Sequence, residues 1–248
     1  MAVDKKLLTA QELAAALNLS VETIWRYTRE GSIPTVKLGK RQYRYDQKAV
    51  LDALSVREES MPYASQGKVT YHEYAQLPEE PGYSYELIDG VLIRQPSPVI
   101  HHQRVCLNLY SILKDYFREI NPQGEVFAAP LDVVFSKHTV VQPDLLYIAD
   151  INQLTSAEYI DLSPLLVVEV LSKSGIRRDR IQKLEVYRQY GVLHYWIVNP
   201  NEETIEAFKL KDKNYMLLTA TNTIFEHPDF PGLSFDMAKV CHNPQSLR

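Results

Sequence analysis

The sequence predicts a mixed α/β (α+β) protein in two parts: a small helical head and a larger body whose helices flank a mixed central sheet. Three observations predict this. The first 57 residues carry ten Lys/Arg and six Asp/Glu, a net charge of +4, whereas the rest carries 17 and 25, a net charge of −8. Helical and strand-like periodicities alternate along the body. Finally, the run PLLVVEVLS at residues 164–172 has the composition of a strand buried on both faces.

Length and composition exclude several classes of protein. The 248 residues are 45% hydrophobic, which is enough for one or two domains with a real core. No apolar run reaches the length of a membrane span, and the N-terminal MAVDKKLL lacks the apolar core of a signal peptide. We therefore expect a cytoplasmic protein with no membrane partner. The two cysteines, Cys106 and Cys241, cannot form a disulfide framework or a four-thiolate zinc site. Either could be a metal ligand by chance, but we interpret Cys106 as a buried structural thiol.

The head begins with two short helices. Thr9 and Glu12 form a capping box that starts the first helix. Ser20 caps the second, over residues 21–30, and Gly31 follows where a C-cap glycine belongs. Two short helices joined by a tight turn are the helix-turn-helix plan, in which the second helix enters the major groove.

A wing and a third helix complete the head. Two short alternating strands around Gly39-Lys40 predict a hairpin, and Asp46 then caps a helix at residues 47–54. With these elements in place, residues 7–54 resemble the excisionase/MerR-type winged helix-turn-helix. A basic head of this kind suits a polyanion, so the expected partner is DNA.

The expected DNA contacts lie on the second helix and the wing. A second helix that exposes Thr23, Arg26 and Arg29 suits phosphates and base edges. Lys40 and Arg41 at the wing tip suit backbone phosphates. Two alternatives stay open, because the arginines can simply be solvated and some heads of this type bind protein partners.

Changes in composition predict the domain boundaries. Residues 57–69 lose periodicity and gather Ser, Pro, Gly and charge, which is typical of a linker. We therefore expect the helix-turn-helix head at residues 1–56, the body at 70–240 and a tail at 241–248.

The elements of the body follow in a recognisable order. Thr70 and Glu73 cap a short helix, and Asp89-Gly90 is the turn of a hairpin. Apolar residues then recur at helical spacing over residues 99–120. The remaining elements are three strand-like runs at 125–135, 140–150 and 164–172, a helix at 177–190, a strand at 193–200 and a hairpin at 204–220.

A carboxylate interrupts the most apolar of these strands. An ionised Glu169 in a buried strand is costly unless something binds it, most obviously a metal ion. Asp144, after Pro143, lies within the preceding strand-like run. Because adjacent strands lie about 4.8 Å apart, carboxylates at matched heights can share one ion.

The order helix, three strands, helix, strand resembles the core of restriction-endonuclease-like nucleases, in which the second and third strands carry acidic ligands. Hydrolysis of a phosphodiester needs a metal ion that polarises the phosphate and lowers the pKa of the attacking water. Mg²⁺ favours one or two carboxylates plus waters, and Mn²⁺ is a possible substitute. The resemblance thus implies a metal held by Asp144 and Glu169.

A sharper resemblance covers residues 68–240. This region is similar to the Uma-two family of putative restriction endonucleases, a branch of the PD-(D/E)XK nucleases. The matching blocks are YELIDG at 85–90, SP at 97–98 with His102, QPDL at 142–145, VVEVLS at 167–172, the residues Asp179, Lys183 and Tyr187, GV at 191–192, and YWIVNP at 195–200.

One position departs from the PD-(D/E)XK pattern. The lysine expected two residues after the glutamate is Leu171 here. The family resemblance implies that Lys183, on the following helix, supplies the amine near the attacking water. Asp179 and Lys183 also fit an ordinary i,i+4 surface pair.

Two further residues complete the candidate site. Glu86 also interrupts an apolar strand, and we expect it to be an extra acidic ligand or a water-orienting group. His102, near the start of the long helix, is expected to contact substrate phosphate or a site carboxylate, and is otherwise a capping or packing histidine. Tyr187 and Trp196 are interpreted as core residues.

The leading hypothesis is a Mg²⁺-dependent DNA endonuclease targeted by its own helix-turn-helix head. A second hypothesis is a DNA-binding regulator or adaptor whose nuclease fold is catalytically silent. A third is that the head binds a protein while the body cleaves nucleic acid non-specifically. Cleavage of both DNA strands needs two active sites, so a homodimer is one assembly that we consider.

Overall fold

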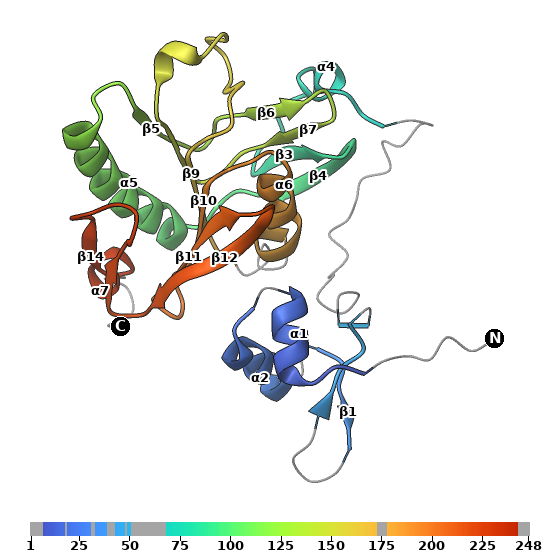
Figure 1. Cartoon of the computed structure of the whole chain (residues 1–248). Helices are drawn as coiled ribbons and strands as arrows, with labels where there is room; N and C mark the ends of the chain where they lie inside the picture. The colour runs from blue at the N-terminus through green and yellow to red at the C-terminus, as the bar shows by residue number, and fades with distance from the viewer. Residues whose placement is uncertain are drawn as a thin grey trace. The chain divides into compact units, whose positions relative to one another are not determined.

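The computed structural model describes residues 7–17, 19–30, 33–38, 43–47, 49–50, 68–172 and 178–242, drawn in colour in Figure 1. Backbone contacts divide the chain into two compact units, Met1–Glu58 and Glu59–Arg248. Among the described residues, no helix is both long and apolar enough to cross a membrane.

The first unit contains the two predicted helices. Its elements are α1 (Ala10–Leu17), α2 (Val21–Glu30), β1 (Val36–Lys37) and β2 (Tyr43–Arg44). The capping box is present, since the Thr9 amide donates to Glu12 at 2.8 Å and the Glu12 amide donates to Thr9 Oγ1 at 3.2 Å. Ser20 Oγ accepts the Thr23 amide at 3.1 Å and so caps α2. The helix boundaries are therefore set by the local hydrogen bonds that the sequence predicts.

The wing and the third helix are only partly described. β1 and β2 pair antiparallel, with Lys37 opposite Tyr43. Asp46 accepts the Ala49 amide at 3.2 Å, as expected of a helix N-cap. The wing tip, including Lys40 and Arg41, the rest of the third helix and most of the expected linker at 57–69 lie outside the described residues.

The second unit contains a six-stranded sheet, a four-stranded sheet and the two-stranded sheet β13-β14, with helices around them (Figure 1). Its helices are α4 (Tyr71–Tyr74), α5 (Ile100–Ile120), the 3₁₀ turn η1 (Ile151–Gln153), the π-helical turn η2 (Arg178–Lys183), α6 (Leu184–Gln189) and α7 (Met237–Val240). Its strands are β3 (Tyr83–Ile88), β4 (Val91–Pro96), β5 (Glu125–Ala128), β6 (Val133–Ser136), β7 (Thr139–Val141), β8 (Leu145–Ile148), β9 (Leu166–Val170), β10 (His194–Asn199), β11 (Thr204–Lys211), β12 (Asn214–Thr221), β13 (Ile224–Glu226) and β14 (Ser234–Asp236).

The central sheet is mixed, as predicted. Its six strands lie in the order β12-β11-β10-β9-β8-β5. β9 and β10 are parallel and are joined through η2 and α6, whereas the other neighbours are antiparallel. Parallel neighbours need a crossover connection, and the predicted helix at 177–190 provides it. The hairpin expected at 204–220 extends this sheet as β11 and β12.

A second sheet has the order β4-β3-β7-β6. The runs 125–135 and 140–150, each predicted as one strand, are in fact each divided between the two sheets. β5 and β8 belong to the six-stranded sheet, and β6 and β7 to the four-stranded one. Pro130 and Pro143 lie at the two breaks, and a proline has no N–H to donate to a ladder. As a result, Asp144 precedes β8 rather than lying in mid-strand.

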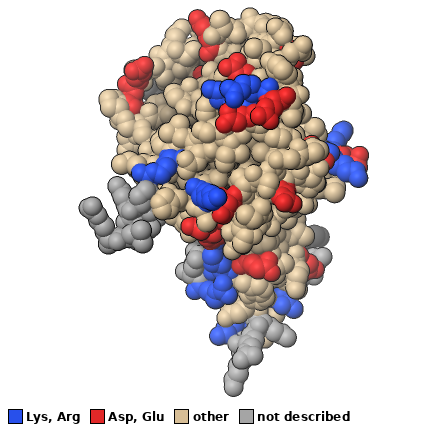
Figure 2. Space-filling view, turned by 90° about the vertical axis from the view of Figure 1, so that its left-hand side faces the viewer, with Lys and Arg blue, Asp and Glu red and all other residues tan. Residues whose placement is uncertain are grey.

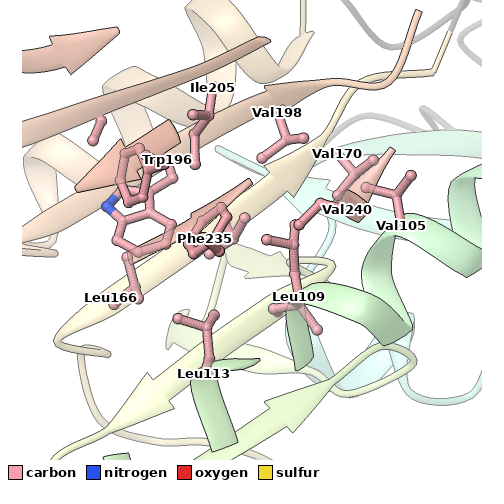
Figure 3. Packing of buried hydrophobic residues seen from close by; sticks show 14 of the residues in the cluster. Val105, Leu109, Leu113, Leu166, Val170, Trp196, Val198, Ile205, Phe235 and Val240 are labelled. Carbon is pink, nitrogen blue, oxygen red and sulfur yellow. The ribbon is translucent and has the colours of Figure 1, made fainter. Parts of the chain in front are cut away.

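The six-stranded sheet is covered on both faces. Leu166, Val168 and Val170 of β9 face the cluster that contains the buried side of α5, whereas Val167 faces the cluster that contains α6. Figure 3 shows the first cluster, in which α5 contributes Val105, Leu109 and Leu113, the strands contribute Leu166, Val170, Trp196, Val198 and Ile205, and the C-terminal segment contributes Phe235 and Val240. Burial on both faces explains why β9 reads as a continuous apolar run.

Two local features refine the sequence prediction. In the Asp89-Gly90 turn both residues have positive φ, 52° and 81°, as a two-residue hairpin turn requires. A side chain at Gly90 would meet Lys68 Cβ at 2.4 Å, so glycine is needed there for space as well. At the other end, Cys241 was expected in the tail but is 2% exposed and packs in the α5 core.

Two histidines are buried in this core. The rings of His194 and His227 lie 5.1 Å apart, and both contact Phe230. Burial disfavours the charged imidazolium and lowers the pKa of each histidine to about 4. Both side chains are therefore neutral in the folded protein at pH 7.

We expect these histidines to destabilise the fold as the pH falls. Their folded pKa values lie below the unfolded value of about 6.5, so the unfolded chain binds more protons between those limits. The free energy of unfolding should therefore decrease from about pH 6.5 towards pH 4. His227→Phe should flatten this slope in urea titrations followed by circular dichroism, whereas His72→Gln, at an exposed position, should leave it unchanged. If the free energy of unfolding of His227→Phe varied with pH as in the wild type, this would contradict the role of His227 in the pH dependence.

Candidate active site

A single buried lysine joins the two sheets. Lys183 Nζ lies 2.8 Å from Glu86 Oε1 and 2.9 Å from Glu169 Oε1. Lys183 and Glu169 are each 2% exposed, and Glu86 is fully buried. Charges are rarely buried to this extent unless they are paired, and here one ammonium contacts two carboxylates.

The local sequence explains how these side chains meet. All five residues of β9 are buried, and Glu169 alternates with Val168 so that it faces α6. Lys183 ends the π-helical turn, and Tyr187 follows four residues later on α6, so both side chains lie on one face. Glu86 comes from the middle of β3 in the other sheet.

Tyr187 completes the contacts of Glu169. Its hydroxyl donates to Glu169 Oε1 at 2.6 Å, and the ring is fully buried. Burial, together with the charges of Glu169 and Glu86, raises the pKa of this phenol well above its usual value. Tyr187 is therefore a neutral donor that helps to hold the Glu169 carboxylate in place.

Asp144 lies beside Glu169 across the β8–β9 ladder. Leu145 pairs with Val168 in an antiparallel register. Asp144, which precedes β8, and Glu169, which follows Val168 in β9, are therefore at neighbouring positions. Asp144 Oδ2 accepts the Val170 amide at 2.7 Å. The side chain of Asp144 is 20% exposed, which makes it the most accessible carboxylate of the site.

His102 and Cys106 approach Asp144 from α5. His102 Nε2 lies 2.7 Å from the Val170 carbonyl oxygen and 3.3 Å from Asp144 Oδ2. Cys106 Sγ lies 3.5 Å from His102 Nδ1. Within the described part of the chain, these three residues form the only group of three or more His, Cys, Asp or Glu whose ligand atoms all lie within 4.8 Å of one another.

Carboxylate oxygens dominate the donor atoms of this site. Among the described residues, Glu86 and Glu169 contact Lys183, and Asp144 lies at the neighbouring position of the β8–β9 register. Carboxylate oxygens are the ligands that a hard divalent cation such as Mg²⁺ favours. The donor set of this site therefore fits a divalent metal ion.

A network of hydrogen bonds orients the Glu86 carboxylate. The Gln142 amide N–H donates to Glu86 Oε1 at 2.7 Å, and the Gln95 side-chain amide also donates to Glu86. The Gln142 side chain in turn donates to Asp132 at 2.8 Å, and Tyr74 donates to the same oxygen at 2.9 Å. This network fixes the carboxylate that contacts Lys183.

The structure brings together all the residues predicted for the body's site. At two positions it distinguishes between the alternatives. Lys183 is not part of a surface pair, because its amine is buried; the side chain of Asp179 lies outside the described residues. His102 makes the expected contact with a site carboxylate, Asp144, and is 7% exposed. Leu171, at the position of the missing lysine, packs in the apolar core.

Sequence reasoning missed the polar roles of Tyr187 and Cys106. Both were assigned to the core, and both are indeed buried. Their spacing carries the signal that was overlooked. Cys106 follows His102 by four residues and Tyr187 follows Lys183 by four, so each shares a helix face with a predicted site residue.

The candidate DNA contacts in the first unit agree only in part with expectation. Arg29 is exposed and Arg26 is half-buried, with its guanidinium carbon 5.0 Å from the centre of the Tyr27 ring. The prediction that Thr23 is exposed is wrong, because Thr23 is 9% exposed and its hydroxyl lies 3.0 Å from Ser20 Oγ. Its hydroxyl supports the helix cap instead.

The face shown in Figure 2 carries scattered charged side chains, and in several places basic and acidic residues adjoin each other. In the second unit, the contact between Arg94 and Glu80 lowers the pKa of the Glu80 carboxyl to about 2. This face therefore does not present one broad basic area among the described residues.

Two family models match the chain. Residues 71–238 match the Uma2 family, described as "Putative restriction endonuclease". Residues 7–55 match a helix-turn-helix domain. The helix-turn-helix predicted from the sequence is thereby confirmed.

Two further proteins are similar to this chain. The uncharacterized protein sll1609 of Synechocystis sp. PCC 6803 is 27% identical over 154 residues, which cover 60% of this chain and 85% of that protein. A crystal structure described as a putative nuclease belonging to DUF820, from Anabaena variabilis, superposes with a TM-score of 0.56 at 17% identity. The superposition covers 70% of this chain and 97% of the other. It confirms the predicted restriction-endonuclease-like fold.

We expect Lys183→Met to destabilise the protein by about 3–5 kcal/mol, because it removes the buried ammonium that contacts the carboxylates of Glu86 and Glu169. Lys114→Met, at an exposed position on α5, removes the same charge and should change the free energy of unfolding by less than about 0.5 kcal/mol. Urea titrations of the full chain measure both. Equal effects of the two substitutions would show that the buried ion pairs do not stabilise this fold.

Proposed function

We propose that this protein, which belongs to the Uma2 family of putative restriction endonucleases, is a metal-dependent endodeoxyribonuclease targeted to DNA by its helix-turn-helix domain. The observation that carries the proposal is the contact of buried Lys183 with the carboxylates of Glu86 and Glu169, with Asp144 at the register position next to Glu169. A nuclease fold and a DNA-binding motif in one chain support DNA as the substrate.

Asp144 and Glu169 would hold the metal ion, for which we propose Mg²⁺, with Mn²⁺ as a substitute. Asp144 directly precedes β8, and Glu169 lies at the neighbouring register position of β9, which suits ligands of one ion. When bound, such an ion polarises the phosphate and lowers the pKa of water. Asp144 is the more exposed of the two, so it is the side from which a phosphodiester would approach.

Lys183 would position the attacking water and offset the negative charge of the phosphate in the pentacoordinate transition state. Its Nζ contacts Glu169 Oε1, the same oxygen that Tyr187 holds, so amine and carboxylate keep a constant geometry. Glu86 is a positioning residue, because it acts on the reaction through Lys183. His102 would likewise position Asp144 through their 3.3 Å contact.

Arg26 and Arg29 of α2 would bind DNA phosphates, together with Lys40 and Arg41 outside the described residues.

One active site hydrolyses one strand, so double-strand cleavage would use a homodimer. We propose this assembly only as a consequence of double-strand cleavage.

We expect purified protein to nick supercoiled plasmid in the presence of Mg²⁺ or Mn²⁺. Asp144→Asn and Glu169→Gln should each lower the rate by about 100-fold or more, because each removes a charged ligand of the ion. Asp115→Asn, an exposed carboxylate on α5, is the matched control and should keep the wild-type rate. Circular dichroism checks that each variant is folded.

A folded wild-type protein that nicks neither plasmid nor RNA with either metal would contradict the nuclease. That result would favour the second hypothesis, a DNA-binding regulator with a silent nuclease fold. Nicking that survives both substitutions would place the chemistry elsewhere in the chain.

We expect Arg29→Ala to weaken binding of the full chain to duplex DNA and to lower its dependence on salt. Removing one phosphate-binding side chain should reduce the slope of log K against log[salt] by about 0.9. Glu22→Ala, at an exposed position of the same helix, is the control and should not weaken binding. Fluorescence anisotropy at several salt concentrations measures the slope. A slope unchanged by Arg29→Ala would remove this arginine from the interface.

A further inference from the structure

The mixed donor set beside Asp144 has a chemistry of its own. His102 and Cys106 lie one turn apart on α5, each 7% exposed, and their ligand atoms and that of Asp144 all lie within 4.8 Å of one another. A thiolate and an imidazole are soft or borderline ligands, which Mg²⁺ does not favour. Neither is required by the proposed hydrolysis.

The hydrogen bonds of His102 select one nitrogen for a metal. Nε2 lies 2.7 Å from the Val170 carbonyl oxygen, which can only accept, so Nε2 carries the proton and Nδ1 carries the lone pair. Nδ1 is the atom that faces Cys106 Sγ. A histidine that binds a metal through one nitrogen typically donates the other N–H to a carbonyl or carboxylate, as this one does.

The spacing of the two α5 ligands also fits a tetrahedral ion. Bonds of about 2.0–2.1 Å to nitrogen and about 2.3 Å to sulfur place these ligand atoms roughly 3.5 Å apart at a tetrahedral angle. The distance between His102 Nδ1 and Cys106 Sγ is 3.5 Å. Asp144 Oδ2 lies 3.3 Å from His102 Nε2, and the ligand atoms of the three residues all lie within 4.8 Å of one another, so an oxygen of this carboxylate is within reach of the ion. A water can take the fourth position, because the carboxylate is partly exposed.

We propose that His102, Cys106 and Asp144 bind a thiophilic divalent cation of the Zn²⁺ class, and that this ion blocks the Mg²⁺ site by occupying Asp144. On binding, the S–H bond of Cys106 breaks, the sulfur–metal bond forms and the proton leaves to solvent. The binding site stands on the geometry above, whereas the blocking role rests on the proposed function.

Cobalt titration of the full chain tests the binding site directly, because Co²⁺ bound to a thiolate absorbs in the near ultraviolet. Wild-type protein should develop this absorption up to one Co²⁺ per chain. Cys106→Ser and Cys106→Ala should lose it, and circular dichroism shows whether they are folded. Cys241→Ser removes the other buried thiol of the chain and should keep the absorption. No absorption in the wild type, or absorption that survives in both folded Cys106 variants, overturns the site.

Inhibition by zinc tests the blocking role. Plasmid nicking in excess Mg²⁺ is measured with increasing Zn²⁺, and each protein is compared with its own rate without zinc. The zinc concentration that halves the rate should be about tenfold or more higher for Cys106→Ser than for wild type or Cys241→Ser. Equal inhibition of all three overturns the blocking role. If the wild type does not nick at all, the proposed nuclease fails, and the cobalt titration still decides the binding site.

Discussion

The ion pairs of one buried lysine are the constraint on which the rest of this fold depends. Lys183 comes from the crossover between β9 and β10, Glu169 from the six-stranded sheet and Glu86 from the four-stranded sheet. Three separate elements thus meet at one ammonium that has almost no contact with water. Because an unpaired charge at this depth is strongly destabilising, the two sheets and the helix are held in one arrangement by it.

The same constraint separates two kinds of carboxylate. Glu86 and Glu169 are buried and occupied by protein donors, so their geometry is set before any substrate arrives. Asp144 is partly exposed and bonded to a backbone amide, so it is the carboxylate at which the site meets solvent. Metal-assisted hydrolysis requires groups that are already in position, such as Glu86 and Glu169, and a ligand that substrate can reach, such as Asp144.

Asp144 also lies where two metal chemistries meet. Towards β9 its neighbour in the register is Glu169, whose carboxylate oxygens suit a hard ion such as Mg²⁺. Towards α5 its neighbours are imidazole and thiol, which suit a softer one. Because Asp144 would be a ligand on both sides, Mg²⁺ and the softer metal ion would compete for it. The proposed nuclease activity would then depend on which metal ion is available.

The sequence by itself determined the element types, the helix caps, the hairpin turn and most of the residues that lie together at the candidate site. Those features depend on neighbours within a few positions, such as the capping boxes at Thr9 and Thr70 or the apolar run around Glu169. Tertiary structure alone decided that two predicted strands are each split between sheets, that Lys183 is buried and that Thr23 is not exposed. It also placed Cys106 and Tyr187 beside the site. These outcomes depend on contacts between residues far apart in the chain, and hydrophobic periodicity reports which face of an element is buried but not which polar group it meets there.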